Sequence, residues 1–255
     1  MNCYYYKKII NKKFLLKEIK RTYILIMENS KNYQIILNQL QNLPLTKEIY
    51  FQFNKGFKKC HKNLKQQKTN FDIIDALKTV FIHNNKTPVL ILEEDAIFDY
   101  INIIQSINEI DNFIKNNEYE IINLGSILYL GYPYKNNMYR TFFNPAAQGV
   151  IYNTSYQKTF LKEIEEIEYN DLWWHQIRFK NYCYDKTLFY QLFKESDNSK
   201  NWDNLFGIKN LERKLINWIG LDKEYKINFF RINTFGKMLF YILIYILIHI
   251  IKNYL

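Results

Sequence analysis

The sequence predicts one α/β domain, built on a mostly parallel sheet with helices on both faces, followed by a C-terminal hydrophobic helix. Short apolar runs alternate with segments whose apolar residues recur at helical spacing, the pattern of strands joined by crossover helices. The 255 residues suffice for one α/β domain with a full core, but not for two large ones. No repeat, low-complexity linker or Pro/Gly-rich stretch divides the chain.

The expected strands are short and apolar, as buried strands of a parallel sheet are. They cover 22–27, 48–53, 89–92, 121–124 and 149–152. The expected helices each place apolar residues on one face. In the helices expected at 33–43 and 72–82 these residues are Ile36, Leu37, Leu40 and Leu43, and Ile74, Leu77 and Phe81, respectively. In the next two helices they are Ile103, Ile104, Ile107 and Ile110, and then Phe160, Leu161, Ile164 and Ile167.

The two ends differ from this central pattern. Residues 1–20 are basic but lack the uninterrupted apolar core of a signal peptide, so we expect a cytosolic or poorly ordered leader there. The domain itself is expected over 21–205, with an extension over 206–237 and a hydrophobic helix over 238–252.

The run 238–251 carries no formal charge and lies between Lys237 and Lys252. As a helix its 14 residues measure about 21 Å, short of the roughly 30 Å hydrocarbon core, which favours a buried or interfacial helix. The run is nevertheless apolar all round, with Tyr and Lys at its margins, which favours a tail anchor in a thin membrane. The chain is therefore expected either to be membrane-associated, with its domain in the cytoplasm, or to be soluble and cytoplasmic if the tail packs on the core.

Charge and cysteine content exclude some classes of partner. The net charge is +10 and the pI about 9.2, but the Lys residues are scattered instead of concentrated on one element, so we expect no nucleic-acid partner. A basic surface still suits an anionic small molecule or a lipid headgroup. Cys3, Cys60 and Cys183 are odd in number and lack metal-ligand spacing, which predicts neither a disulfide framework nor a zinc site, and favours a reducing compartment.

Three acidic residues, Glu93, Glu94 and Asp95, directly follow the apolar strand 89–92. Ligands bind outside the carboxyl ends of strands in such sheets, and adjacent carboxylates repel unless they are protonated, solvated or neutralised by a cation. In an extended chain Glu93 and Asp95 point to one side and Glu94 to the other. Two carboxylates on one side could hold Mg²⁺ or Mn²⁺ together with diphosphate oxygens. The alternative is a solvated exit from the strand.

The segment NFDIIDALKTVFIHNNKTPVLILEEDAIFDY at 70–100 resembles glycosyltransferase family 25, the lipopolysaccharide-biosynthesis and procollagen galactosyltransferase group, in which a helix leads to a strand ending in Leu-Glu-Asp-Asp. RTYILIMENSKNYQIILNQL, AAQGVIYNTSYQKTFL and IEYNDLWW resemble further segments of the family. The resemblance covers about 21–202 and is dense only around the three acids. It includes copies in large DNA viruses, and the AT-biased composition fits such a source.

The resemblance implies a Rossmann-type GT-A fold, a UDP-sugar donor, a divalent metal (Mn²⁺ or Mg²⁺) and inversion at the sugar carbon. It implies that Asp95 is the direct metal ligand and that Glu93 and Glu94 face the ribose or the sugar. The alternation along the strand also makes Glu93 a candidate metal ligand. Glu94 stands where the family usually has Asp. The family's Arg after the first strand has no counterpart, and Lys31 could replace its charge but not its bidentate geometry.

The other candidate residues lie downstream. Asp171 could be the base that takes the proton of the acceptor hydroxyl, or merely a helix N-cap. His175 could complete the metal shell or contact the diphosphate, or it could be an exposed His without a role. Trp173 and Trp174 could stack on an acceptor sugar or belong to the core. Residues 184–191 are predicted to be a strand or loop closing the site, with Gln191 as a hydrogen-bonding residue of the donor site or a surface residue.

These observations predict a metal-dependent inverting glycosyltransferase, galactosyl- or glucosyltransferase-like, that moves a sugar from a UDP-sugar to a glycan or glycoprotein acceptor. A second hypothesis is a catalytically inactive, membrane-anchored interaction protein of the same fold, motivated by Glu94 and the missing Arg. A third is a metal-dependent phosphoryl-transfer enzyme. The lack of a Gly-rich phosphate loop, with only 7 Gly in the chain, counts against the third hypothesis.

Overall fold

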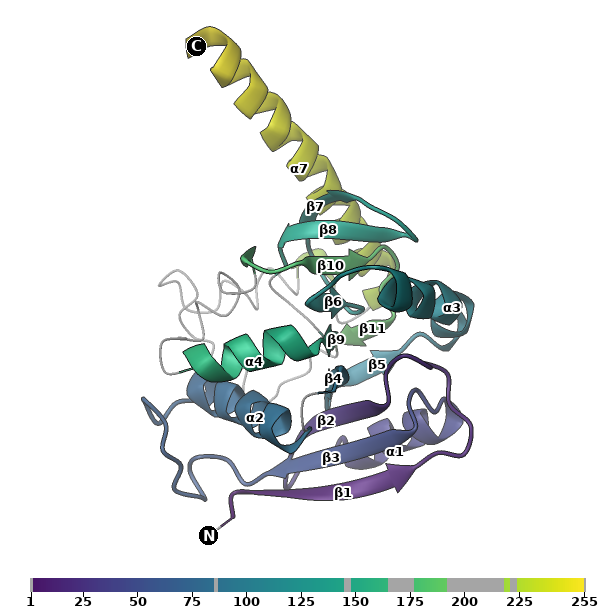
Figure 1. Cartoon of the computed structure of the whole chain (residues 1–255), viewed down its shortest axis with the longest axis vertical. Coiled ribbons are helices and arrows are strands. Elements are labelled where there is room, and N and C mark those ends of the chain that lie inside the picture. Colours follow the sequence, from purple (N-terminus) through teal and green to yellow (C-terminus); the bar gives the residue numbers. More distant parts are fainter. Residues whose placement is uncertain are drawn as a thin grey trace.

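The computed structural model describes residues 2–84, 87–144, 148–164, 177–191, 218–220 and 224–254. Its elements follow the alternation expected from the sequence (Figure 1). In chain order they are β1 (Tyr4–Ile10), β2 (Arg21–Met27), α1 (Tyr33–Asn42), β3 (Glu48–Asn54), α2 (Thr69–His83), β4 (Val89–Glu93), β5 (Ala96–Phe98), α3 (Tyr100–Asn116), β6 (Ile121–Asn123), β7 (Leu130–Pro133), β8 (Met138–Phe143), β9 (Gly149–Tyr152), α4 (Thr154–Glu163), β10 (Asn181–Tyr184), β11 (Phe189–Gln191) and α7 (Tyr225–Tyr254).

Within the described residues nine strands form one sheet in the order β1-β3-β2-β4-β9-β6-β10-β8-β7, and β5 pairs with β11 separately. Strands β3, β2 and β4 are parallel, as are β6 and β10. Strand β9 runs antiparallel between β4 and β6, and β1 and β8 also enter antiparallel. The α/β class is confirmed, and the sheet is mixed because these three strands oppose the others.

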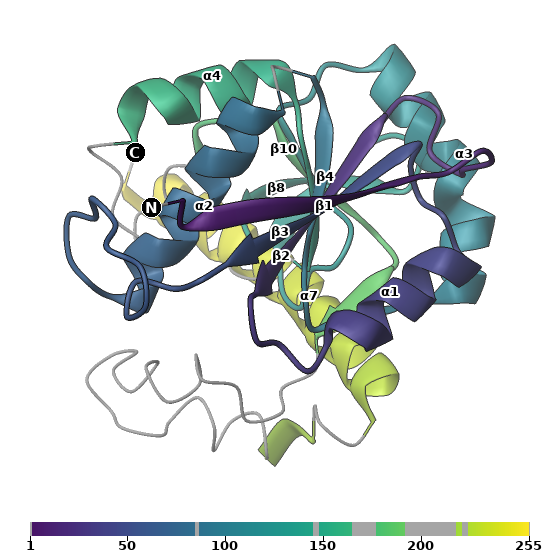
Figure 2. The same cartoon turned by 90° about the horizontal axis from the view of Figure 1, so that it is seen from below.

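Helices cover both faces of the sheet (Figure 2). Helices α1 and α3 pack on one face, where Leu40 and Ile110 belong to the larger apolar core. Helices α2 and α4 pack on the other, where Phe81 and Phe160 belong to a second core. The prediction that Ile104 belongs to the buried face of its helix was wrong. Ile104 is 57% exposed, because it lies on the side of α3 that faces solvent.

The N-terminal residues are ordered, contrary to the expected leader. Strand β1 pairs with β3 over its full length, from Tyr4 opposite Asn54 to Ile10 opposite Glu48. Its seven residues, YYYKKII, are mostly exposed apart from Tyr4, as suits an edge strand, and Lys residues protect such edges from further pairing.

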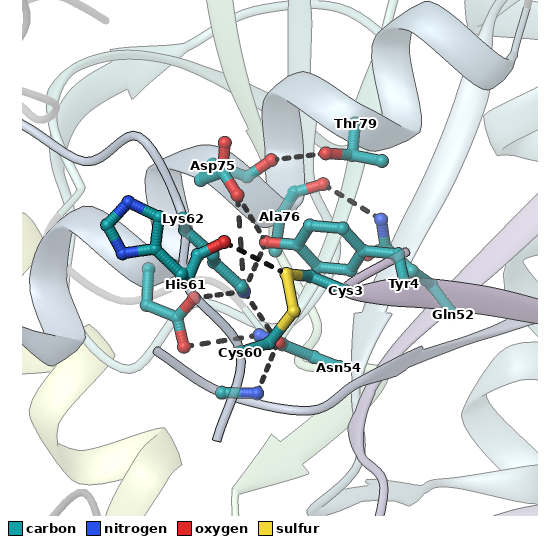
Figure 3. A network of polar contacts seen from close by, with 12 residues as sticks. Cys3, Tyr4, Gln52, Asn54, Cys60, His61, Lys62, Asp75, Ala76 and Thr79 are labelled. Atoms are coloured by element: carbon teal, nitrogen blue, oxygen red, sulfur yellow. Dashed lines mark hydrogen bonds and ion pairs between the residues drawn. A yellow bond between two sulfur atoms is a disulfide. The ribbon is translucent and has the colours of Figure 1, made fainter. Parts of the chain in front are cut away.

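A disulfide joins Cys3, just before β1, to Cys60 in the loop after β3 (Figure 3). The prediction that the cysteines form no disulfide was therefore wrong. The odd count hid the pair, because Cys183 is free and buried in β10. Disulfides persist in oxidising compartments and are rare in the cytosol.

A buried ion pair lies beside the disulfide (Figure 3). The Lys62 ammonium donates to Asp72, to the Asn54 side-chain oxygen at 2.6 Å and to the Tyr4 hydroxyl at 2.7 Å. The Tyr4 hydroxyl in turn donates to the Asp75 carboxylate at 2.7 Å. The side chain of Lys62 is only 2% exposed, so the network ties β1, β3, the loop after β3 and helix α2 together.

We expect Cys3→Ser to lower the free energy of unfolding by about 3 kcal/mol, because the disulfide closes a long loop and so restricts the unfolded chain. Denaturant titration of the oxidised wild type and of the variant measures the difference. Cys183→Ser is the matched control, and the disulfide would be dispensable if both variants unfolded at the wild-type midpoint.

Helix α7 begins at Tyr225, well before the expected start of the hydrophobic helix. Its first turns pack on the domain, where Phe229 is fully buried and the Asn233 amide donates to the Ser126 carbonyl at 3.2 Å. Its second half extends away from the domain (Figure 1). Among the described helices it alone, over Tyr225–Lys252, has the length and composition to cross a membrane.

Candidate active site

The acidic residues lie at the carboxyl ends of the parallel strands β2, β4 and β6, along one end of the sheet. Glu93 is the last residue of β4 and pairs with Leu25 of the parallel strand β2. Glu94 and Asp95 form the turn into β5. Because parallel strands end at the same edge, the loop from β2 to α1 comes beside this turn.

Glu94 is held by the loop after β2. The backbone N–H of Met27 donates to a Glu94 carboxylate oxygen at 2.9 Å, and Ser30 adds a side-chain hydrogen bond. Burial raises the pKa of Glu94 from its ordinary value, and these two hydrogen bonds oppose the rise. In this structure Glu94 thus fixes the position of the loop after β2.

Glu93 lies beside Gln148, which directly precedes β9. Gly149 pairs with Leu92 across the antiparallel β4–β9 ladder, so Gln148 comes opposite Glu93. Burial, reinforced by the charges of Asp95 and Glu94, raises the pKa of Glu93 to about 8, and a hydrogen bond from Gln148 opposes the rise. A carboxyl with this pKa binds a proton readily unless a cation takes the proton's place.

Asp95 contacts Gln191 from the small β5–β11 sheet. Gln191 pairs with Ala96, and its amide nitrogen lies 3.3 Å from one Asp95 carboxylate oxygen. The other oxygen, Oδ1, is buried and has no hydrogen-bond partner. Burial raises the pKa of Asp95 to about 6, and the hydrogen bond from Gln191 opposes the rise.

A close contact brings β11 over this edge. A Cβ placed on Gly149 would lie 2.3 Å from the Phe189 ring, and one placed on Gly125 would lie 2.6 Å from the Phe189 carbonyl oxygen. Both positions require glycine, because any larger residue would push Phe189 outward. The glycines therefore allow Gln191, two residues after Phe189, to reach Asp95.

The donor atoms at this edge suit a hard divalent cation. The chemistry is that of carboxylate and amide oxygens, with a buried, unpartnered oxygen on Asp95 and another on Gln148. No Lys or Arg contributes to the pKa shifts of the three acidic residues in the described part of the chain. The same part holds no group of three His, Cys, Asp or Glu that could bind a metal. By their chemistry Glu93 and Asp95 could serve as two ligands of such an ion, with diphosphate oxygens supplying others.

Four predicted site residues, Asp171, Trp173, Trp174 and His175, lie outside the described residues, and their roles stay predictions. The structure brings Gln191 to Asp95, and the predicted role of Gln191 in the donor site stays a prediction. Sequence reasoning missed Gln148 and Asn123, and both side-chain polar atoms of Asn123 are buried without a partner. Gln148 is the polar residue directly before strand 149–152. It could have been predicted as a site residue only if that strand had been expected to run antiparallel beside β4.

We expect the unliganded protein to lose stability as the pH rises from about 4.5 to about 8, because the folded-state pKa of Glu93 is raised from 4.5 to about 8. Between these values the folded chain binds more protons than the unfolded chain, so its free energy of unfolding is highest below the ordinary pKa and falls toward the raised one. Thermal melts across this range measure the effect. Glu93→Gln should flatten the fall, and an unchanged pH profile in this variant would assign it to other groups.

No family model matches the chain, and no curated protein matches it. The fold is similar to several solved structures. UDP-glucose pyrophosphorylase complexed with UDP-glucose matches with 10% identity, covering 68% of this chain and 74% of the other, at a TM-score of 0.39. A glycosyltransferase involved in the glycosylation of the major capsid of PBCV-1 matches with 9% identity, covering 71% of this chain and 96% of the other, at a TM-score of 0.38. The protein A197 from STIV matches with 9% identity, covering 65% of this chain and 81% of the other, at a TM-score of 0.38.

These likenesses concern the general fold, at TM-scores too low to support an argument about activity. The mixed sheet, the helices on both faces and the acidic turn after β4 are consistent with the predicted α/β GT-A-like class. None of the comparisons identifies family 25 in particular.

Proposed function

We propose that this chain is a metal-dependent inverting glycosyltransferase that moves a sugar from a UDP-sugar to a glycan or glycoprotein acceptor. The observation that carries the proposal is the half-buried Asp95 carboxylate, whose Oδ1 is buried without a partner, next to a second carboxylate, Glu93, whose pKa is raised. A folded protein keeps such a cluster at a cost, and strongly shifted carboxyls at the edge of a sheet are typical of functional sites.

Each residue around the acidic turn after β4 then has a role. Asp95 and Glu93 would hold Mn²⁺ or Mg²⁺, and the bound ion would stabilise the negative charge on the departing UDP. Gln191 orients Asp95 through its hydrogen bond, and Gln148 lies opposite Glu93 just before β9. Glu94 fixes the loop after β2, which would flank the nucleotide.

The transfer step needs a base on the acceptor side. In an inverting reaction the acceptor oxygen attacks the sugar carbon from the face opposite UDP, as the base removes the hydroxyl proton. Asp171 is our proposed base. Since inversion depends on this residue and on the acceptor, the stereochemistry of the product tests this part of the proposal separately.

Titration calorimetry with UDP and Mn²⁺ tests the donor site. We expect wild type to bind UDP only when Mn²⁺ is present, and Asp95→Ala to lose that binding. Glu118→Ala, which removes a side chain that is 85% exposed, is the control and should bind as wild type does. The absence of metal-dependent UDP binding by wild type would refute the proposal. UDP binding without hydrolysis or transfer of UDP-glucose or UDP-galactose would favour the inactive interaction protein.

We also infer that the domain faces an oxidising compartment. The support is the Cys3–Cys60 disulfide, whose formation the cytosol disfavours. Alkylation of free thiols in intact cells, followed by mass spectrometry of the chain, tests this inference. We expect Cys3 and Cys60 to be protected until a reductant is added, and labelling of both without reductant would place the domain in a reducing compartment.

A further inference from the structure

Apart from His249, the residues of α7 from Tyr241 to Ile251 are apolar or aromatic on every side of the helix. Each residue from 241 to 252 is exposed, including Tyr241, Leu243, Tyr245 and Leu247. A groove on a protein partner would cover only one side of such a helix, whereas lipid chains surround it. The run 238–251 also contains no Gly, Ala, Ser or Thr, the small residues that let membrane helices pack closely together. Lipid is therefore the surrounding that fits this half better than a second copy of the chain.

The half that is clear of the domain is too short to cross a bilayer alone. Residues 241–252 measure about 18 Å as a helix, against a hydrocarbon core of roughly 30 Å. Residues just before them are still attached to the domain: Phe240 stacks on Phe142 of β8, with ring centroids 5.9 Å apart, and the Lys237 ammonium pairs with Asp185. Insertion of α7 thus draws the adjoining edge of the domain against the lipid.

That edge presents aromatic side chains. In the hairpin β7–β8, Tyr132 is 41% exposed and Phe142 is 44% exposed, and their rings lie 5.8 Å apart. Together with Phe240 they form a continuous aromatic surface that joins the hairpin to the helix. Aromatic residues are favoured at the level of the lipid headgroups, because the ring is apolar and, in Tyr, the hydroxyl stays hydrated.

We propose that Tyr132, Phe142 and Phe240 form a membrane-docking surface that lies in the headgroup layer of a bilayer while the free half of α7 enters the lipid. The sheet then stands with its β7 edge on the membrane and its β1 edge farthest away (Figure 1). The acidic turn after β4 lies five strand spacings from the β7 edge, about 24 Å at the usual spacing of neighbouring strands. This surface does not depend on the proposed sugar transfer.

An environment-sensitive fluorophore, NBD, on single introduced cysteines tests the docking surface in the full-length chain. Phe142→Cys and Tyr132→Cys place the label on the surface, and Ile10→Cys places it on β1 at the opposite edge, where the side chain is 64% exposed. Native cysteines leave the labelling specific, because Cys3 and Cys60 are paired and Cys183 is buried.

With vesicles of phosphatidylcholine and phosphatidylserine, we expect the emission at positions 142 and 132 to shift to the blue and to be quenched by lipids with a nitroxide near the headgroup. The emission at position 10 should not change. Ile244→Asp with Ile248→Asp, in the exposed half of the helix, should release the chain from the vesicles and abolish the shift.

Two results would overturn the proposal. In one, the chain floats with the vesicles but the labels at 142 and 132 report water, which would mean that α7 alone holds the membrane. In the other, the chain stays in the supernatant as a dimer whose formation shifts the 142 emission, which would make this surface a contact between two copies.

Discussion

If the proposed function holds, replacing Asp95 by Asn should lower the turnover of sugar transfer by about a thousandfold, or about 4 kcal/mol in the activation barrier, because Asp95 would then lose its charge as a ligand of the ion that would stabilise the departing UDP. Asn has the size of Asp and retains an oxygen that can accept the hydrogen bond from Gln191. The substitution also removes one of several mutually repelling carboxylates. The variant is therefore expected to melt no lower than wild type, which separates a chemical loss from a folding loss.

Initial rates with a UDP-sugar and saturating Mn²⁺, read as UDP release, measure this loss. Gln191→Ala is the matched variant, since it leaves the Asp95 charge intact and removes only the contact that orients it. It should cost about tenfold to a hundredfold, as expected for loss of a single hydrogen bond to a charged group, which is worth about 1.5–3 kcal/mol. If Asp95→Asn kept more than a tenth of the wild-type turnover, the metal site would have to be placed elsewhere on the chain.

The sequence was informative wherever local pattern decides structure. The mostly apolar runs 22–27, 48–53 and 89–92 are strands, as expected because parallel strands that are buried on both faces are rich in apolar residues. Helix α2 covers the expected 72–82, with Leu77 and Phe81 buried as predicted. The acidic turn was predictable for the same reason, since three charges after a buried strand are conspicuous in one stretch of sequence.

Pairings between distant segments were not predictable from local pattern. The periodicity of β9 identifies a strand but not its direction, and an antiparallel β9 is what brings Gln148 to Glu93. The partnership of Cys3 and Cys60 depends on β1 pairing with β3, which a basic N-terminal segment does not reveal. Gln191 was found only because a segment closing the site was expected, and its contact with Asp95 depends on glycine at position 149.

Disruption of the buried ion pair should give the largest loss of stability. Asp72→Leu leaves the Lys62 ammonium buried, with the nearest Asp75 oxygen 4.0 Å away. An uncompensated buried charge of this kind lowers the free energy of unfolding by about 3–5 kcal/mol. Lys62→Met should also lower the free energy of unfolding, because it leaves the Asp72 carboxylate buried without its cationic partner; the Asp72 side chain is only 7% exposed.

The double variant Lys62→Met with Asp72→Leu distinguishes a charge effect from a packing effect. It removes both charges and keeps similar side-chain volumes, so it should recover most of the loss, as replacing a whole buried ion pair by apolar residues often does. Lys180→Met is the control, because it breaks an exposed pair with Glu118 and should change stability by less than about 1 kcal/mol. Urea titrations of the four proteins and the wild type give these values. A double variant no more stable than Asp72→Leu would show that the hydrogen bonds of Lys62 to Tyr4 and Asn54, and not its charge pairing, hold β1 and the loop after β3 in place.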